Sequence, residues 1–200
     1  MYLAMSPTDV LDSVIRLNPS AKTVVDVGAY YCGWSKYMAD QLPEAKVYAM
    51  QTSNPEKLNH IIDTTKGELS EFDILGWKKH MKGLLATQYQ KYYDFNLFAQ
   101  EVNSRNNIVG VLATSPQWQI NYDICLISMT KDPNENFKQY VHWRKFGNKG
   151  SVLCIAAYSE LEDDEFEGPL QGRSDFVDAV KKLDPNIIEY DHEHLLLHNL

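Results

Sequence analysis

The sequence predicts an α/β fold in which helices cover both faces of a mostly parallel sheet. Runs rich in β-branched and other apolar residues are typical of strands buried on both faces. Such runs lie at 23–27, 46–50, 107–114, 122–129 and 151–157. Segments with helical spacing alternate with them, as expected for a parallel sheet with crossover helices. The last stretch, 186–200, divides at 191–193 into two short strands, so an antiparallel C-terminal hairpin completes a predicted seven-stranded sheet.

The helices are expected between these strands, where apolar residues recur three and four positions apart. They are predicted at Pro7–Leu17, 34–42, 54–103 and 133–146. Pro133 is a favoured first helical residue, with Asp132 before it as the cap. The glycine-containing segment 147–150 is expected to close that helix as a loop.

Length and composition limit the classes of protein to consider. The 200 residues, 44% hydrophobic and 23% charged, fit a globular protein, and we expect a single domain over 1–200. No apolar run approaches the roughly 20 residues of a membrane span, and we do not expect a secreted protein, because 1–11 lacks a basic region followed by an apolar core. The net charge of -8 would repel a phosphate backbone, so nucleic acid is not expected as the main partner.

The cysteines bear on the cellular compartment. There are three of them, and no two form a Cys-x-x-Cys pair. An odd, scattered set suggests neither a disulfide framework nor a zinc ribbon. We therefore expect a cytoplasmic protein.

The stretch 23–35 reads as a buried strand, a tight turn and the start of a helix. Asp26 interrupts the β-branched run near the end of the strand, where a carboxylate needs hydrogen-bond donors. Gly28 and Gly33 permit positive φ or a close approach of the backbone to a ligand. Because ligands of open α/β sheets bind outside the carboxyl ends of the strands, this turn is the predicted floor of a site.

The residues Val-Asp-Val-Gly-Ala-Tyr-Tyr-Cys-Gly-Trp-Ser at 25–35 resemble the first motif of the class I S-adenosylmethionine-dependent methyltransferases. In that family the first strand carries an acidic residue two positions before a glycine-rich turn. The order of elements over 20–183 is similar to the sugar and macrolide O-methyltransferase-like branch, and 172–183 resembles that branch's next helix. This resemblance implies a Rossmann-like three-layer sandwich, S-adenosylmethionine as cofactor and a small hydroxylated molecule as substrate.

The same resemblance implies a set of site residues. Lys131 and Tyr158 follow the fourth and fifth strands, where either could act as a base or orient the substrate. At the end of the second strand, where the family usually has a carboxylate, Gln51 could accept one hydrogen bond and donate another. The implied cofactor-binding residues are Asp26, Gly28, Ala29, Tyr31, Gly33, Gln51, Thr114, Ser115 and Ser128.

No metal site is predicted. Metal-assisted members of the branch carry acidic residues or His after the fourth strand and an acidic residue after the fifth, where this chain offers only Asp132. His192, His194 and His198 share one face of the last predicted strand, but no fourth ligand with suitable spacing accompanies them. A solvated face of the hairpin is the preferred interpretation of these histidines.

Two other functions fit parts of the pattern. A protein that keeps the fold but has lost catalysis, and serves as a binding or assembly module, would explain the missing glycines and Gln51. In such a protein Tyr30, Tyr31 or Trp118 would fill the substrate cleft. A nucleotide- or nicotinamide-binding enzyme fits less well, since the turn lacks the Gly-x-Gly-x-x-Gly fingerprint.

The segment 77–98 carries an aromatic-rich helical pattern. Such a stripe is best explained by packing, either in the core or against a second copy of the chain. A homo-oligomer formed through these helices is therefore a further expectation.

Overall fold

A computed structural model describes residues 7–29, 32–51, 95–112, 118–127, 133–156, 168–191 and 194–198. Within these ranges helices and strands alternate as predicted, and the strands expected from the sequence are all present. The elements are α1 (Pro7–Leu17), β1 (Thr23–Val27), α2 (Gly33–Gln41), β2 (Lys46–Gln51), α5 (Phe95–Val102), β3 (Ile108–Leu112), β4 (Tyr122–Ile127), α6 (Pro133–Trp143), β5 (Gly147–Ala156), α7 (Arg173–Leu183), β6 (Ile188–Glu189) and β7 (His194–His198).

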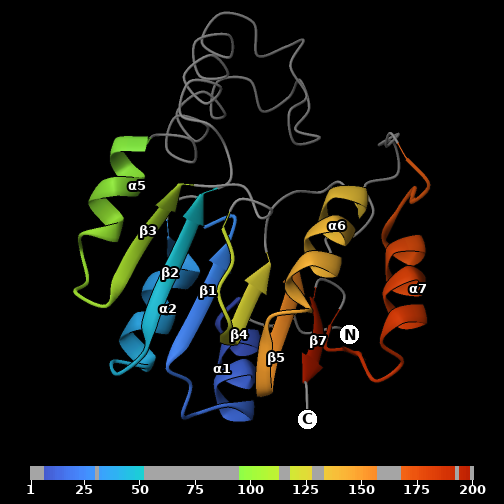
Figure 1. The fold of residues 1–200 in the computed structure, drawn as a ribbon, viewed down its shortest axis with the longest axis horizontal. Helices are drawn as coiled ribbons and strands as arrows, with labels where there is room; N and C mark the ends of the chain where they lie inside the picture. Colours follow the sequence, from blue (N-terminus) through green and yellow to red (C-terminus); the bar gives the residue numbers. More distant parts are fainter. Residues whose placement is uncertain are drawn as a thin grey trace, which may run out of the picture.

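The strands form one seven-stranded sheet in the order β3-β2-β1-β4-β5-β7-β6. Pairing is parallel from β3 through β5, whereas β7 runs antiparallel to both β5 and β6. In Figure 1 the arrowheads of β1, β2 and β3 point to the upper edge of the sheet, and β7 points down. The predicted mostly parallel sheet with an antiparallel hairpin is confirmed. Strand order reverses between β1 and β4, because the chain continues from β1 to β2 on one side and from β4 to β5 on the other.

Two hydrophobic cores flank the sheet. One joins Val24 and Leu126 to α1, α2 and α5, and the other joins Val25 and Ile127 to α6 and α7. Successive residues of a strand point to opposite faces, so the β-branched run of β1 supplies both cores. In Figure 1 α2 lies behind the sheet and α6 in front of it. This arrangement is the predicted three-layer sandwich.

One predicted boundary is wrong. The helix expected to reach Phe146 ends at Trp143, and the segment 147–150 is the first part of β5 instead of a loop. Tyr122 donates its backbone N–H to the carbonyl oxygen of Phe146 at 3.0 Å, which draws the chain into the sheet directly after the helix. The register between β4 and β5 then shifts, and Gly150 has a φ of +77° close to this irregularity. The glycines therefore serve an irregular strand instead of a turn.

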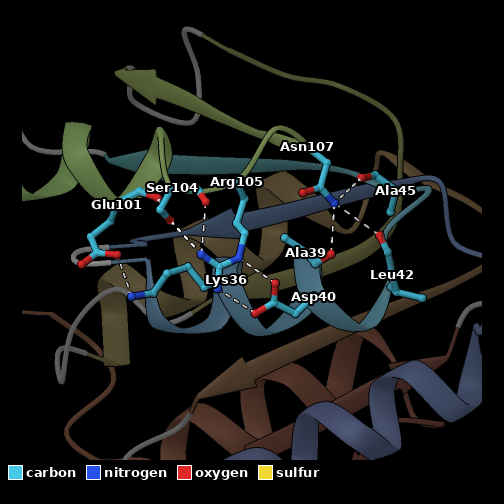
Figure 2. Close-up of polar contacts among 9 residues, drawn as sticks. All are labelled: Lys36, Ala39, Asp40, Leu42, Ala45, Glu101, Ser104, Arg105 and Asn107. Atoms are coloured by element: carbon cyan, nitrogen blue, oxygen red, sulfur yellow. Dashed lines mark hydrogen bonds and ion pairs between the residues drawn. The ribbon is translucent and has the colours of Figure 1, made fainter.

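Polar contacts fasten α2 to the segment that contains α5 and β3 (Figure 2). Asn107, just before β3, donates from Nδ2 to backbone carbonyls at the end of α2 and beyond it. These acceptors are the carbonyl oxygens of Ala39, Leu42 and Ala45. Two ion pairs lie beside them, Lys36 with Glu101 at 2.7 Å and Asp40 with Arg105 at 2.6 Å. The helix that follows the glycine-containing turn is thus held in place from its far end.

The stretch predicted as mainly helical, 54–103, is described only over its last part. There Phe98 of α5 is buried in the core that α1 and α2 also form. This end of the aromatic pattern at 77–98 therefore packs inside the chain, and the rest of the pattern lies outside the described residues. Among the helices that the structure describes, none has the length and apolarity needed to cross a membrane.

Candidate functional site

The turn after β1 lies at the carboxyl edge of the sheet and is hydrogen-bonded to β2. Gly28 follows β1 with a φ of +85°, a conformation that glycine adopts at little cost. The backbone N–H groups of Gly28 and Ala29 both donate to the carbonyl oxygen of Met50, each at 3.0 Å. Met50 is followed by Gln51, the last residue of β2. The turn and the end of β2, which the sequence assigned to one site, are therefore held side by side.

The start of α2 differs in one respect from the prediction. Gly33, expected to need positive φ or close backbone approach, is the first residue of the helix, and Cys32 before it has φ +59° and ψ +29°. Cys32 alone has positive φ among the non-glycine residues that the structure describes. Its side chain is fully buried. Desolvation, and to a smaller extent the charge of Asp26, raise the pKa of the Cys32 thiol to about 12. Cys32 is therefore a protonated thiol that fills the core behind the turn.

Asp26 lies beneath the turn with 1% of its surface exposed. Its carboxylate accepts a hydrogen bond from the Ser35 hydroxyl at 2.5 Å and another from the backbone N–H of the same residue. The N-cap residue of α2, Cys32, makes no side-chain capping bond, so Asp26 supplies that acceptor to the first turn of the helix from a neighbouring strand. Burial raises the pKa of Asp26 to about 6, and the two bonds from Ser35 oppose that rise.

Ser35 is a residue that sequence reasoning missed. It is fully buried and comes from the third position of α2. A hydroxyl placed shortly after a glycine-containing turn, within reach of an acidic residue in the preceding strand, is the signal that could have indicated it. The buried Asp26–Ser35 pair joins β1 to the first turn of α2.

The turn also occupies the point where the strand order reverses. Val27, the last residue of β1, pairs with Met50 on one side and with Ile127, the last residue of β4, on the other. Open α/β sheets bind their ligands outside the carboxyl ends of the strands at such a point. The predicted site residues that the structure brings together here are Asp26, Gly28, Ala29, Gly33 and the backbone of Gln51.

The other predicted site residues lie outside the described residues. These are Tyr31, Thr114, Ser115, Ser128, Lys131 and Tyr158. The strands that lead toward them are described, and Leu112, Ile127 and Ala156 end β3, β4 and β5. The roles of these six residues stay predictions.

Trp118, one of the residues expected to fill the cleft of a silent protein, lies elsewhere. Its ring contacts Tyr48 of β2 and Trp143 of α6, with ring centroids 5.3 and 6.1 Å away. Trp143 in turn contacts Tyr122, the first residue of β4. Trp118 therefore packs on the α6 face of the sheet, toward the amino end of β4 and away from the carboxyl edge.

The prediction of a solvated histidine face is wrong for His194, which is 7% exposed. Asp191 provides hydrogen-bond acceptors for this buried residue, and its Oδ1 accepts the backbone N–H of His194 at 2.7 Å. The ring Nδ1 of His194 also lies 2.9 and 3.0 Å from the two carboxylate oxygens of Asp191. The Asp-x-x-His spacing is the sequence feature that could have indicated this pair. Among the residues described, no group of three or more His, Cys, Asp or Glu could hold a metal ion.

Comparison with solved structures identifies the fold. The chain is similar to the O-methyltransferase TomG from Streptomyces achromogenes, solved in complex with SAM, with 13% identity and a TM-score of 0.54 over 99% of this chain and 82% of that one. The O-methyltransferase from Bacillus cereus, solved with SAH, gives 11% identity and a TM-score of 0.54 over 98% and 82% of the two chains. An O-methyltransferase family protein from Burkholderia thailandensis gives 10% identity and a TM-score of 0.54, over 96% of this chain and 55% of that one.

No protein-family model and no curated protein matches the sequence. At identities this low, a structural likeness shows the fold and nothing finer. The chain has the Rossmann-like fold of the class I methyltransferases.

Proposed function

We propose that the protein is an S-adenosylmethionine-dependent methyltransferase that acts on a small hydroxylated molecule. The observation that carries the proposal is the position of the Gly28 turn. It lies at the reversal of strand order in a methyltransferase-type sheet, and it is hydrogen-bonded to the end of β2. Two of the similar solved structures hold SAM or SAH, which supports the same ligand class here.

The residues at the turn fit the chemical groups of this cofactor. The amino end of α2 begins at Gly33, and the positive end of a helix dipole favours the carboxylate of an amino-acid moiety. Gln51 ends β2 beside the turn, and its amide group could accept from one ribose hydroxyl and donate to the other. Asp26 contributes indirectly, since its carboxylate is occupied by Ser35 and keeps the turn and helix aligned.

When bound, S-adenosylmethionine supplies a methyl group already activated on a sulfonium. The protein must then bring the acceptor oxygen into line with that methyl and exclude competing water. Deprotonation of the hydroxyl is the remaining chemical task, and Lys131 and Tyr158 stay predicted candidates for it or for orienting the acceptor.

The proposed compartment is a reducing one, the cytoplasm. All three cysteines of the chain, Cys32, Cys125 and Cys154, are free and buried. Burial raises the pKa of each thiol, so these side chains act as small hydrophobic residues.

Calorimetric titration with S-adenosylmethionine and S-adenosylhomocysteine, followed by a turnover assay, tests the proposed function. The assay measures the S-adenosylhomocysteine formed from S-adenosylmethionine in the presence of a pooled panel of phenols, catechols and sugars. We expect micromolar binding of both ligands and product that depends on the panel. Binding without turnover on any hydroxylated compound would favour the catalytically silent alternative. Failure of both ligands to bind at millimolar concentration would contradict the proposal.

A further inference from the structure

We propose that His194, oriented by Asp191, is the base that accepts the proton of the methyl acceptor's hydroxyl group. The inference rests on the proposed methyltransferase function and names the residue that completes it. It starts from the one buried histidine–carboxylate pair among the described residues, which belongs to the β6–β7 hairpin.

The pair lies at the same edge of the sheet as the Gly28 turn. His194 is the first residue of β7, and its partner across the ladder is Ala156, the last residue of β5. Because β7 runs antiparallel to β5, the hairpin brings His194 to the carboxyl edge. Its ring packs against Trp34, with ring centroids 5.9 Å apart, and Trp34 directly follows Gly33 at the start of α2. The imidazole is thus joined by one side-chain contact to the helix that begins at the proposed cofactor site.

Asp191 fixes the chemistry of the ring. An ionised carboxylate only accepts hydrogen bonds, so the ring proton lies on Nδ1, which is 2.9 and 3.0 Å from the two carboxylate oxygens. The lone pair needed by a base is then on Nε2, on the other side of the ring. Asp191 also accepts the backbone N–H of His194 at 2.7 Å, so the backbone and the ring are held by the same group. A carboxylate placed in this way orients the imidazole and stabilises the imidazolium that forms.

The step balances in atoms and charge. The acceptor O–H bond breaks as its proton moves to Nε2 of His194, and the acceptor oxygen forms a bond to the methyl carbon of S-adenosylmethionine. The carbon–sulfur bond breaks with its electron pair left on sulfur, so the sulfonium becomes a neutral thioether. The positive charge passes to the His194 imidazolium beside Asp191, and the proton then leaves to solvent.

His198 provides a matched control on the same strand. It lies on the same face of β7 as His194, but it pairs with Val152, farther from the carboxyl edge along β5. It is half-buried, and no carboxylate contact is described for it. A change at His198 therefore alters a histidine of the hairpin without touching the proposed base.

The first experiment needs no acceptor. Diethyl pyrocarbonate acylates an unprotonated imidazole nitrogen that is accessible to the reagent. Mass spectrometry of the full-length protein then identifies the modified residue. We expect acylation of His194 that slows at least fivefold when S-adenosylhomocysteine is bound, with the rate at His198 unchanged. An unreactive His194, or one that reacts at the same rate with and without the ligand, would overturn the proposal.

The second experiment uses the turnover assay with His194→Gln, Asp191→Asn and His198→Gln. We expect kcat to fall about 100-fold for His194→Gln and about tenfold for Asp191→Asn, with unchanged Kd for S-adenosylmethionine and unchanged KM for the acceptor. His198→Gln should stay within twofold of wild type. Turnover of His194→Gln within threefold of wild type would overturn the assignment while leaving the methyltransferase function intact. Failure of the wild type to bind S-adenosylmethionine or S-adenosylhomocysteine would instead overturn the proposed methyltransferase function.

Discussion

The two faces of the sheet are filled by different kinds of side chain. On the α6–α7 face the core contains the largest buried aromatic residues, Trp143, Tyr140, Tyr122 and Phe176. On the face covered by α1, α2 and α5 the core is built mainly from small aliphatic residues, with Cys and Met. The buried Asp26 also lies on that side, bonded to Ser35 of α2.

We infer that the α6–α7 face mainly stabilises the fold, whereas the face covered by α1, α2 and α5 supports the candidate site. Aromatic residues bury the most apolar area and dominate the energetics of a core, so the α6–α7 face should contribute most to folding. A buried carboxylate costs free energy unless it is paired, so Asp26 beneath the Gly28 turn indicates a site whose geometry is held at some expense to stability. The following predictions test this division, beginning with the largest expected effect.

Trp143→Ala should give the largest loss of stability. The side chain is fully buried between Trp118, Tyr122 and Phe146. Its removal should leave a cavity that lowers the free energy of unfolding by about 3–5 kcal/mol. Urea denaturation measures this loss, and Ile188→Ala, at a side chain 58% exposed, is the control expected to change little. A loss below about 1 kcal/mol would show that the aromatic face is not the main source of stability.

Asp26→Asn should remove a pH dependence from folding. The pKa of Asp26 is 3.8 as the ordinary value and about 6 in the folded protein, so the folded state binds more protons between these values. The contribution of Asp26 to stability should therefore be greatest below about pH 4, fall as the pH rises to about 6, and stay lower above it, by about 3 kcal/mol in total. Unfolding of wild type and variant across this range measures the difference.

Asp40→Asn is the matched control for that experiment. Asp40 is exposed, and its hydrogen bond from Arg105 lowers the pKa of its carboxyl group. Its contribution has the opposite sign, so the fall attributed to Asp26 should persist in Asp40→Asn. An equal fall in the Asp26→Asn variant would contradict the account of the buried carboxylate.

The polar contacts between α2 and the segment before β3 should contribute less to stability, and the more buried contact should contribute more. Asn107→Ala leaves the carbonyls of Ala39, Leu42 and Ala45 without their shared donor, which should cost about 1–3 kcal/mol. Arg105→Ala removes an exposed ion pair with Asp40 and two exposed hydrogen bonds to Ser104, so it should cost less than Asn107→Ala. Chemical denaturation of the two variants compares them, and equal losses would contradict the larger role assigned to the partly buried Asn107 amide.

Much of the fold could be predicted from the sequence because its strands are buried on both faces. The β-branched run at 23–27 and the apolar run at 122–127 have few alternatives to a central parallel strand. The boundary after Trp143 could not be predicted in this way. Glycines at 147 and 150 indicate a turn locally, and only the pairing of Tyr122 with the incoming chain shows that they belong to β5.

The candidate site was predicted in part. The turn at Gly28 and its place beside the end of β2 were predicted from the motif, because a glycine with positive φ leaves a local signal in the sequence. The positive φ of Cys32 and the partnership of Asp26 with Ser35 depend on how α2 packs on β1, which no local pattern specifies. The solvent exposure predicted for His194 was wrong, because alternation in a strand shows which residues share a face but not whether that face is buried.

Calorimetric titration of two glycine variants with S-adenosylmethionine tests whether the Gly28 turn forms the floor of the cofactor site. Gly28 and Gly150 both have positive φ, +85° and +77°, so alanine at either position should cost roughly 1–2 kcal/mol of backbone energy. A Cβ at Gly150 meets no other atom within 4 Å, which makes it a control for strain alone. We expect the Kd of Gly28→Ala to be at least tenfold weaker than that of the wild type, and the Kd of Gly150→Ala to stay within twofold of it. Wild-type affinity in a folded Gly28→Ala variant would contradict this expectation.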